Sequence, residues 1–164
     1  MIDTFFNRAE IEKLALRFRE GIETARENGK LKGSLLNYYP RGCCEIASEL
    51  LAQYLCNFDI PCCLVYLEYY YDYNENKYSH VWLTVYNTYI VDITADQYEF
   101  SVGFKDCRAD IVPCYVGTGN KFHDKFSIKR DGIEEFLGFD NYPIEHSSKL
   151  NYLFNIVCDC INSD

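Results

Sequence analysis

The sequence predicts an α+β domain in which helices precede and follow an antiparallel β-meander. Apolar residues recur with helical spacing up to residue 57, aromatic and β-branched residues fill strand-length runs between residues 62 and 94, and helical spacing returns in the last third. With 164 residues, of which 48% are hydrophobic, the chain is long enough to bury a core. We therefore expect a single domain over residues 1–164.

Two amphipathic helices are expected in the N-terminal third. Apolar residues repeat every three or four positions over residues 11–25, and Gly29 follows as a C-terminal stop. A loop that ends at Gly42 then leads into a second helix over about residues 43–57.

The central segment predicts an antiparallel meander, with strands at residues 62–71, 78–86 and 89–94. Residues 72–77 form the first turn, and the second turn is centred on Asn87. A less regular stretch follows, with one more strand at 111–116 and a turn at 117–120.

The C-terminal third returns to helical spacing. Residues 133–137 predict a short helix that Gly138 ends. Apolar positions between residues 150 and 161 predict a last amphipathic helix, with Ser147 or Ser148 as its N-cap.

Charge and hydropathy limit the classes of function. The net charge of −9 and the isoelectric point near 4.8 argue against nucleic acid or an anionic membrane as partner, because phosphate binding needs clustered lysine and arginine. The chain does not start with a signal-peptide pattern, and no apolar stretch has the length of a membrane span. We expect a cytoplasmic protein, with secretion as an effector by a signal-independent route left open.

The nine cysteines do not form a disulfide or zinc pattern. Their number is odd, two pairs are adjacent in sequence, and no Cys-x-x-Cys occurs, so we expect most of them to be small buried hydrophobic residues. Asp92 and Asp96 lack the glycine turn of a calcium loop, and we expect no metal there.

Cys44 is the candidate nucleophile. At about 100° per residue, the apolar stripe over residues 46–55 centres near Cys43, so Cys43 should be buried and Cys44 should lie at the rim of the stripe. A helix N-terminus stabilises a thiolate, and Gly42 can leave the Cys44 N–H free as an oxyanion donor. This segment alone fits equally well two small residues that merely begin a helix.

His80 and Asp92 are the candidate base and orienter. Asp92 lies among apolar residues of its strand, where a carboxylate without a partner is costly. A bond from His80 would satisfy it and fix the imidazole tautomer. The alternatives are a core histidine with another partner and an aspartate that caps its own strand end.

The pairing of the two strands attaches a condition to this hypothesis. A two-residue turn at 87–88 would put His80 and Asp92 on opposite faces of the sheet. The triad therefore requires an odd-length loop, such as residues 85–87 with His80 opposite Asp92, or a β-bulge.

The order of these motifs resembles the papain-like and transglutaminase-like cysteine enzymes. The resemblance rests on Gly-Cys-Cys-Glu-Ile-Ala-Ser-Glu-Leu-Leu at 42–51, His-Val-Trp at 80–82 and Ile-Val-Asp-Ile-Thr at 90–94, and it spans about residues 37–97. That superfamily carries a cysteine at the start of a central helix, a histidine on a strand with an aromatic residue close behind, and an aspartate or asparagine on the next strand. Its members include proteases, protein-glutamine deamidases, cross-linkers and acyltransferases, among them bacterial toxin and effector domains of similar size.

The resemblance implies Cys44 as nucleophile, His80 as general base and Asp92 as orienter, in a papain-like or transglutaminase-like fold. The sequence departs from the pattern in three ways: no tryptophan follows the cysteine, no clear oxyanion glutamine is present, and the spacing between His80 and Asp92 is short for the superfamily. The residues expected to bind substrate or the oxyanion are Asn37, Gly42, Trp82 and Gln97.

These residues together predict a cysteine hydrolase or transferase that acts on an amide of a protein or peptide through a catalytic triad. Thiol protease, glutamine deamidase and transamidase chemistry all fit, and none needs a cofactor or metal. The alternatives are a catalytically inactive interaction module of the same fold and a thiol-rich redox-sensing or metal-holding protein. The sequence makes no prediction of oligomeric state.

Overall fold

The structure is a computed structural model that describes residues 5–72 and 76–162, apart from the side chains of residues 130 and 131. Residues 73–75, at the centre of the turn predicted at 72–77, lie outside the described residues. The described chain confirms the α+β class, with helices α1 (Arg8–Glu27), α2 (Cys44–Cys56) and α3 (Ile144–Ile161) and strands β1 (Cys62–Tyr70), β2 (Lys77–Val85), β3 (Tyr89–Asp92), β4 (Tyr115–Gly117) and β5 (Ser127–Glu135).

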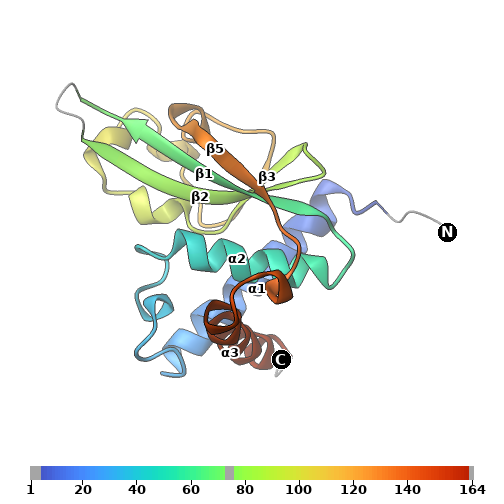
Figure 1. The fold of residues 1–164 in the computed structure, drawn as a ribbon. Helices are drawn as coiled ribbons and strands as arrows, with labels where there is room; N and C mark the ends of the chain where they lie inside the picture. The colour runs from blue at the N-terminus through green and yellow to red at the C-terminus, as the bar shows by residue number, and fades with distance from the viewer. Residues whose placement is uncertain (1–4, 73–75, 163–164) are drawn as a thin grey trace.

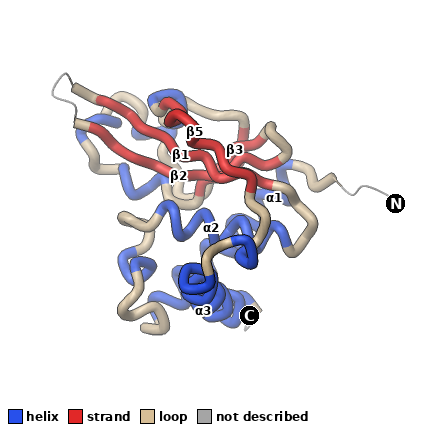
Figure 2. The backbone as a smooth tube through the Cα atoms, viewed as in Figure 1, coloured by secondary structure: helices blue, strands red, loops and turns tan. Residues whose placement is uncertain are grey.

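The strands form one antiparallel sheet in the order β4-β3-β2-β1-β5. The first four strands are consecutive neighbours, as a meander requires, and β5 returns to pair with the free edge of β1. Helix α2 lies under one face of this sheet, and α1 and α3 lie beyond it (Figures 1 and 2). Within the described residues, no helix has both the length and the apolar character needed to cross a membrane.

The sheet separates two apolar clusters. Because successive side chains of a strand point to opposite faces, Val81 and Leu83 of β2 join the large cluster between sheet and helices, whereas Trp82 joins a second cluster on the other face. The second cluster is rich in aromatic residues and is completed from the segment after β3, by Tyr98, Phe104, Phe122 and Phe126. His80, two residues from Trp82, contacts the rings of this second cluster.

The helix predicted at 133–137 is wrong, because residues 133–135 belong to β5 and residues 136 and 137 lie in neither a helix nor a strand. Its residues pair with β1, with Val65 opposite Ile133, so ladder hydrogen bonds at an open sheet edge outweigh local helix propensity. Gly132 permits this pairing, because a Cβ atom there would lie 2.8 Å from the Tyr66 carbonyl oxygen.

Two further boundaries differ from the prediction. Helix α3 begins at Ile144 with Pro143 as N-cap, not at the predicted serines, because the fixed φ of proline suits a helix start. The strand predicted at 111–116 is reduced to β4, since Pro113 has no N–H to donate to a ladder. Helix α2 and the first three strands begin within one residue of their predicted positions. Helix α1 begins three residues before its apolar repeat.

Candidate active site

Cys44 is the first residue of α2 and follows a turn whose backbone conformation favours glycine. Gly42 has φ +66°, the left-handed region that favours glycine, and Cys43 is the N-cap. The side chain of Cys43 joins the core, with Cys43 only 2% exposed, whereas Cys44 is half-buried. The helical phase therefore correctly predicted which of the two cysteines lies at the rim.

His80 and Asp92 form a buried pair. The Nε2 atom of His80 lies 2.7 Å from Oδ2 of Asp92, and both side chains are 0% exposed. Helix α2 is tied to the same part of β2, since Ser48 Oγ donates to the Val81 carbonyl at 3.2 Å. The start of α2 is thus held close to the strand that carries the histidine.

The turn between β2 and β3 meets the parity condition. Leu83 pairs with Val91 and Val85 pairs with Tyr89, so residues 86–88 form an odd, three-residue turn. The specific register with His80 opposite Asp92 is wrong, because this pairing, if continued, places Asp92 beside Trp82. His80 and Asp92 still meet, since residues two apart on a strand share a face.

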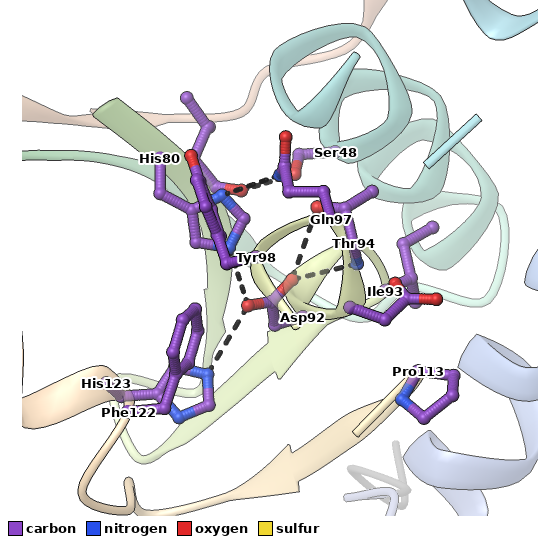
Figure 3. A network of polar contacts seen from close by, with 12 residues as sticks. Ser48, His80, Asp92, Ile93, Thr94, Gln97, Tyr98, Pro113, Phe122 and His123 are labelled. Atoms are coloured by element: carbon purple, nitrogen blue, oxygen red, sulfur yellow. Dashed lines mark hydrogen bonds and ion pairs between the residues drawn. The ribbon is translucent and has the colours of Figure 1, made fainter. Parts of the chain in front are cut away.

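Every oxygen of the Asp92 carboxylate has a partner. Oδ1 accepts from the Thr94 N–H at 2.9 Å and from the Thr94 hydroxyl at 3.3 Å. Oδ2 accepts from His80, and Nε2 of His123 lies 3.4 Å from the same oxygen. Figure 3 shows Asp92 between the two histidine rings. Such partners are what a buried carboxylate needs to remain charged.

The electrostatics favour a thiolate–imidazolium pair. Burial alone would lower the pKa of His80, but the charge and hydrogen bond of Asp92, with a smaller contribution from Cys44, raise it to about 9. Burial alone would raise the pKa of the Cys44 thiol, but its hydrogen bond with His80 and the charge of His80 lower it. Burial also opposes ionisation of Asp92, yet His80 and His123 hold its pKa well below the usual range.

Gln97 joins the site from the turn that follows β3. Its side-chain Nε2 lies 3.3 Å from Nδ1 of His80, and its Oε1 accepts the Gly42 N–H at 3.2 Å. The predicted residues Gly42 and Gln97 are therefore in contact with each other, although they are far apart in sequence. The amide connects the base to the turn in front of the nucleophile.

A buried arginine holds this turn in place. Arg19 of α1 donates to both carboxylate oxygens of Asp96, at 3.0 and 2.8 Å, and to the carbonyls of Ile93 and Pro113 at 2.8 and 2.6 Å. Because Asp96 directly precedes Gln97, the guanidinium fixes the backbone that presents the amide. No helical or strand period in the sequence distinguishes this arginine from its exposed neighbours.

The other two predicted residues lie differently. Trp82 is 4% exposed and packs edge-to-face on His80, with 5.7 Å between ring centroids, so it forms a wall of the site. Asn37 lies in a short 3-10 helix (Leu35–Tyr38), where its N–H donates to the Ser34 carbonyl. Among the described residues, the Asn37 side chain makes no hydrogen bond with the triad.

Among the described residues no group of three or more histidine, cysteine or acidic side chains could hold a metal ion. All nine cysteines are free thiols. No protein-family model matches the chain, and neither a curated protein nor a solved structure matches it significantly.

Proposed function

We propose that this protein is a cysteine-dependent hydrolase or transferase of the papain-like or transglutaminase-like type, acting on an amide of a protein or peptide. The observation that carries the proposal is the buried His80–Asp92 pair, 2.7 Å between Nε2 and Oδ2, with the Cys44 thiol at the start of α2 near enough that it and His80 shift each other's pKa. A nucleophile, a base and an orienter in this chain of contacts are what acyl transfer requires.

The first half-reaction follows from these contacts. The Cys44 thiolate attacks the amide carbon, a C–S bond forms, and the carbonyl π electrons move to the oxygen. When the tetrahedral intermediate collapses, the C–N bond breaks and the leaving amine takes the proton that His80 carries on Nδ1. Asp92 stays ionised and keeps the ring oriented through Nε2.

The second half-reaction decides the class of enzyme. Neutral His80 removes a proton from water or from an acceptor amine, the new C–O or C–N bond forms, and the C–S bond breaks to return the thiolate. Water gives a protease or a deamidase, and an amine gives a transamidase. All three outcomes use the same residues.

The oxyanion has two candidate donors. The first N–H groups of a helix have no intrahelical acceptor, so the Cys44 N–H can donate to it. Gln97 is the second: once Nδ1 of His80 carries a proton for the thiolate, it no longer accepts from the Gln97 amide. The Gln97 N–H groups are then free to turn toward the substrate oxygen.

Exposed aromatic side chains support a peptide substrate. Tyr38, 68% exposed, precedes the Gly42 turn, and Phe100, 75% exposed, follows the turn that carries Gln97. The two turns meet through the Gly42–Gln97 hydrogen bond. Substrate would therefore approach Cys44 between loops that each offer an apolar contact.

A second candidate is an interaction module that keeps this arrangement without catalysis. Complete burial of the His80 side chain favours it, because a general base must reach its proton directly or through one water. Both candidates predict the same fold, so reactivity must separate them.

Alkylation tests the proposal directly. We expect iodoacetamide at pH 6 to modify Cys44 about 10-fold faster or more than the exposed Cys56, because the pKa of Cys44 is lowered and the thiolate is the form that reacts. His80→Ala should remove this advantage, and Cys56→Ala should leave it unchanged. The enzyme also predicts a Cys44-dependent burst of nitrophenolate with 4-nitrophenyl acetate.

Uniformly slow thiols, or fast alkylation of Cys44 that survives His80→Ala, would contradict the thiolate–imidazolium pair. Fast alkylation without an acyl burst would favour the interaction module.

A further inference from the structure

His123 is a buried polar side chain of the site that the proposed mechanism leaves unused. It lies in a short 3-10 helix (His123–Lys125) before β5 and is 4% exposed. Its ring packs against Trp82 and Tyr115, with centroids 4.8 and 4.5 Å away. Its Nε2 points to the Asp92 oxygen that also accepts from His80 (Figure 3).

The hydrogen bonds of Asn120 determine which ring nitrogen of His123 carries a proton. Asn120 Oδ1 accepts the N–H groups of Phe122 and His123, both at 3.1 Å, and its Nδ2 donates to the Asp110 carbonyl at 2.8 Å. Both ends of the amide are thereby assigned. Because Nδ1 of His123 lies 2.7 Å from this same oxygen, Nδ1 must be the protonated nitrogen.

This assignment leaves neutral His123 with a bare Nε2. Among the described residues Nε2 has no ordinary hydrogen-bond partner, and its nearest charged neighbour is Asp92 Oδ2 at 3.4 Å. Two lone pairs that face each other in a buried site are unfavourable. The imidazolium has no such conflict, because its Nε2–H donates to the carboxylate.

Charge balance gives the same answer. The working site contains the Cys44 thiolate, the His80 imidazolium and the Asp92 carboxylate, which together carry a net charge of −1 in a desolvated interior. An uncompensated buried charge is costly. One more cation beside Asp92 makes the group neutral, and His123 is the only titratable cation placed there among the described residues.

We propose that His123 is a positioning residue that, as an imidazolium, holds Asp92 from the side opposite His80 and balances the charge of the thiolate–imidazolium site. The inference rests on the proposed function. The titratable groups that face His123 are Asp92 on β3, His80 beyond that carboxylate on β2, and the Tyr115 phenol on β4, with Asp124 next to it in the chain.

The proposal predicts the sign of two shifts. A positive charge favours the thiolate of Cys44 and disfavours the imidazolium of His80, so its removal must move both titrations to higher pH. We expect His123→Gln, which supplies a side-chain amide N–H donor but no charge, to raise both by about half a pH unit or more. The titration midpoint of Cys44 is measured by the pH dependence of iodoacetamide alkylation, and that of His80 by ¹⁵N NMR of the histidine rings.

The two shifts separate a charge role from a structural one. If His123 only packs against Asp92, His123→Gln loosens the His80–Asp92 bond. The titration midpoint of Cys44 then rises, while that of His80 falls. That opposite movement, or no movement, would overturn the proposal. His146→Gln is the matched control. His146 pairs with Glu49, at 3.0 Å, and not with Asp92, so this variant should shift neither titration midpoint.

Wild-type protein gives an independent measurement if the variant does not fold. The ¹⁵N shifts of His123 at pH 7 should be those of a doubly protonated ring, and a neutral Nδ1–H ring would overturn the proposal. Failure of the proposed function would look different: Cys44 would then show no fast acid-side alkylation in the wild type, whatever the state of His123.

Discussion

Gln97 lies where two requirements of the site conflict. Its amide contacts Nδ1 of His80, the nitrogen that must carry a proton when Cys44 is a thiolate. An amide N–H and a ring N–H cannot donate to each other, so formation of the ion pair releases the Gln97 amide. At the residue scale, the proposed mechanism therefore makes ionisation of Cys44 and release of the oxyanion donor one event.

This coupling predicts a selective defect in Gln97→Ala. Alkylation of Cys44 should change less than about 3-fold, because the thiolate depends on His80. Acylation by 4-nitrophenyl acetate should fall about 10- to 100-fold, because its transition state places charge on the carbonyl oxygen. Asn37→Ala is the control and should leave both rates unchanged; a defect in Asn37→Ala alone would reverse the two roles.

At the element scale, the placement of α2 and β2, which carry the proposed nucleophile and base, follows from patterns local in the sequence. The segment after β3 that supports them is held by contacts with residues far away in the sequence. Phase within α2 and parity between β2 and β3 are properties of neighbouring residues, so the sequence alone could place Cys44 at the rim and could state the turn parity that puts His80 on the face of Asp92. Arg19 and His123 reach the site through long-range contacts with the segment after β3. Neither follows from any local period.

The return of β5 to the sheet has the same cause. Residues 133–137 contain good helix formers, and only the unpaired edge of β1 makes a strand more favourable there. That edge exists once the meander has formed. Sequence reasoning that treats each segment separately cannot include it.

The clamp between α1 and the turn after β3 predicts a large loss of stability in Arg19→Met. Arg19 is 7% exposed, and its removal leaves the Asp96 carboxylate and the Pro113 carbonyl without the guanidinium donor, whereas the Ile93 carbonyl keeps the Tyr39 hydroxyl. We expect the free energy of unfolding, from urea denaturation, to fall by about 3–5 kcal/mol. Arg17→Met, an exposed change on the same helix, should cost less than about 1 kcal/mol.

Adding Asp96→Asn to Arg19→Met should recover part of this loss, because the uncompensated carboxylate is then removed. If the double variant is no more stable than Arg19→Met, the ion pair is not the source of the effect.

At the scale of the whole molecule, the proposed thiolate–imidazolium pair means that folding transfers a proton from Cys44 to His80. Between about pH 6.5 and pH 8.5 the unfolded chain holds its proton on the thiol, and its imidazole is neutral. In the folded protein the thiol pKa is lowered and the pKa of His80 is raised to about 9, and both shifts favour the proposed state with the proton on the ring. Both states bind one proton at this pair, and the pair contributes no pH dependence to stability in this range.

Cys44→Ala should reveal the contribution of His80 protonation to the pH dependence of the free energy of unfolding. Without the thiol, folded His80 still binds a proton because Asp92 holds it, whereas the unfolded imidazole loses its proton above about pH 6.5. A group whose pKa is raised on folding stabilises the protein fully below its unfolded pKa, and this stabilisation is lost as the pH rises through the folded value. The free energy of unfolding of Cys44→Ala, relative to wild type, should therefore fall by about 1.4 kcal/mol per pH unit between about pH 7 and pH 8.

The relative slope isolates this pair, because the other titrating groups are common to both proteins. Urea denaturation at closely spaced pH values measures it, and Cys56→Ala, which removes an exposed thiol, should follow the wild type. Parallel pH profiles for Cys44→Ala and wild type would mean that the folded protein holds the proton on Cys44. The thiolate–imidazolium pair, and with it the proposed nucleophile, would then be wrong.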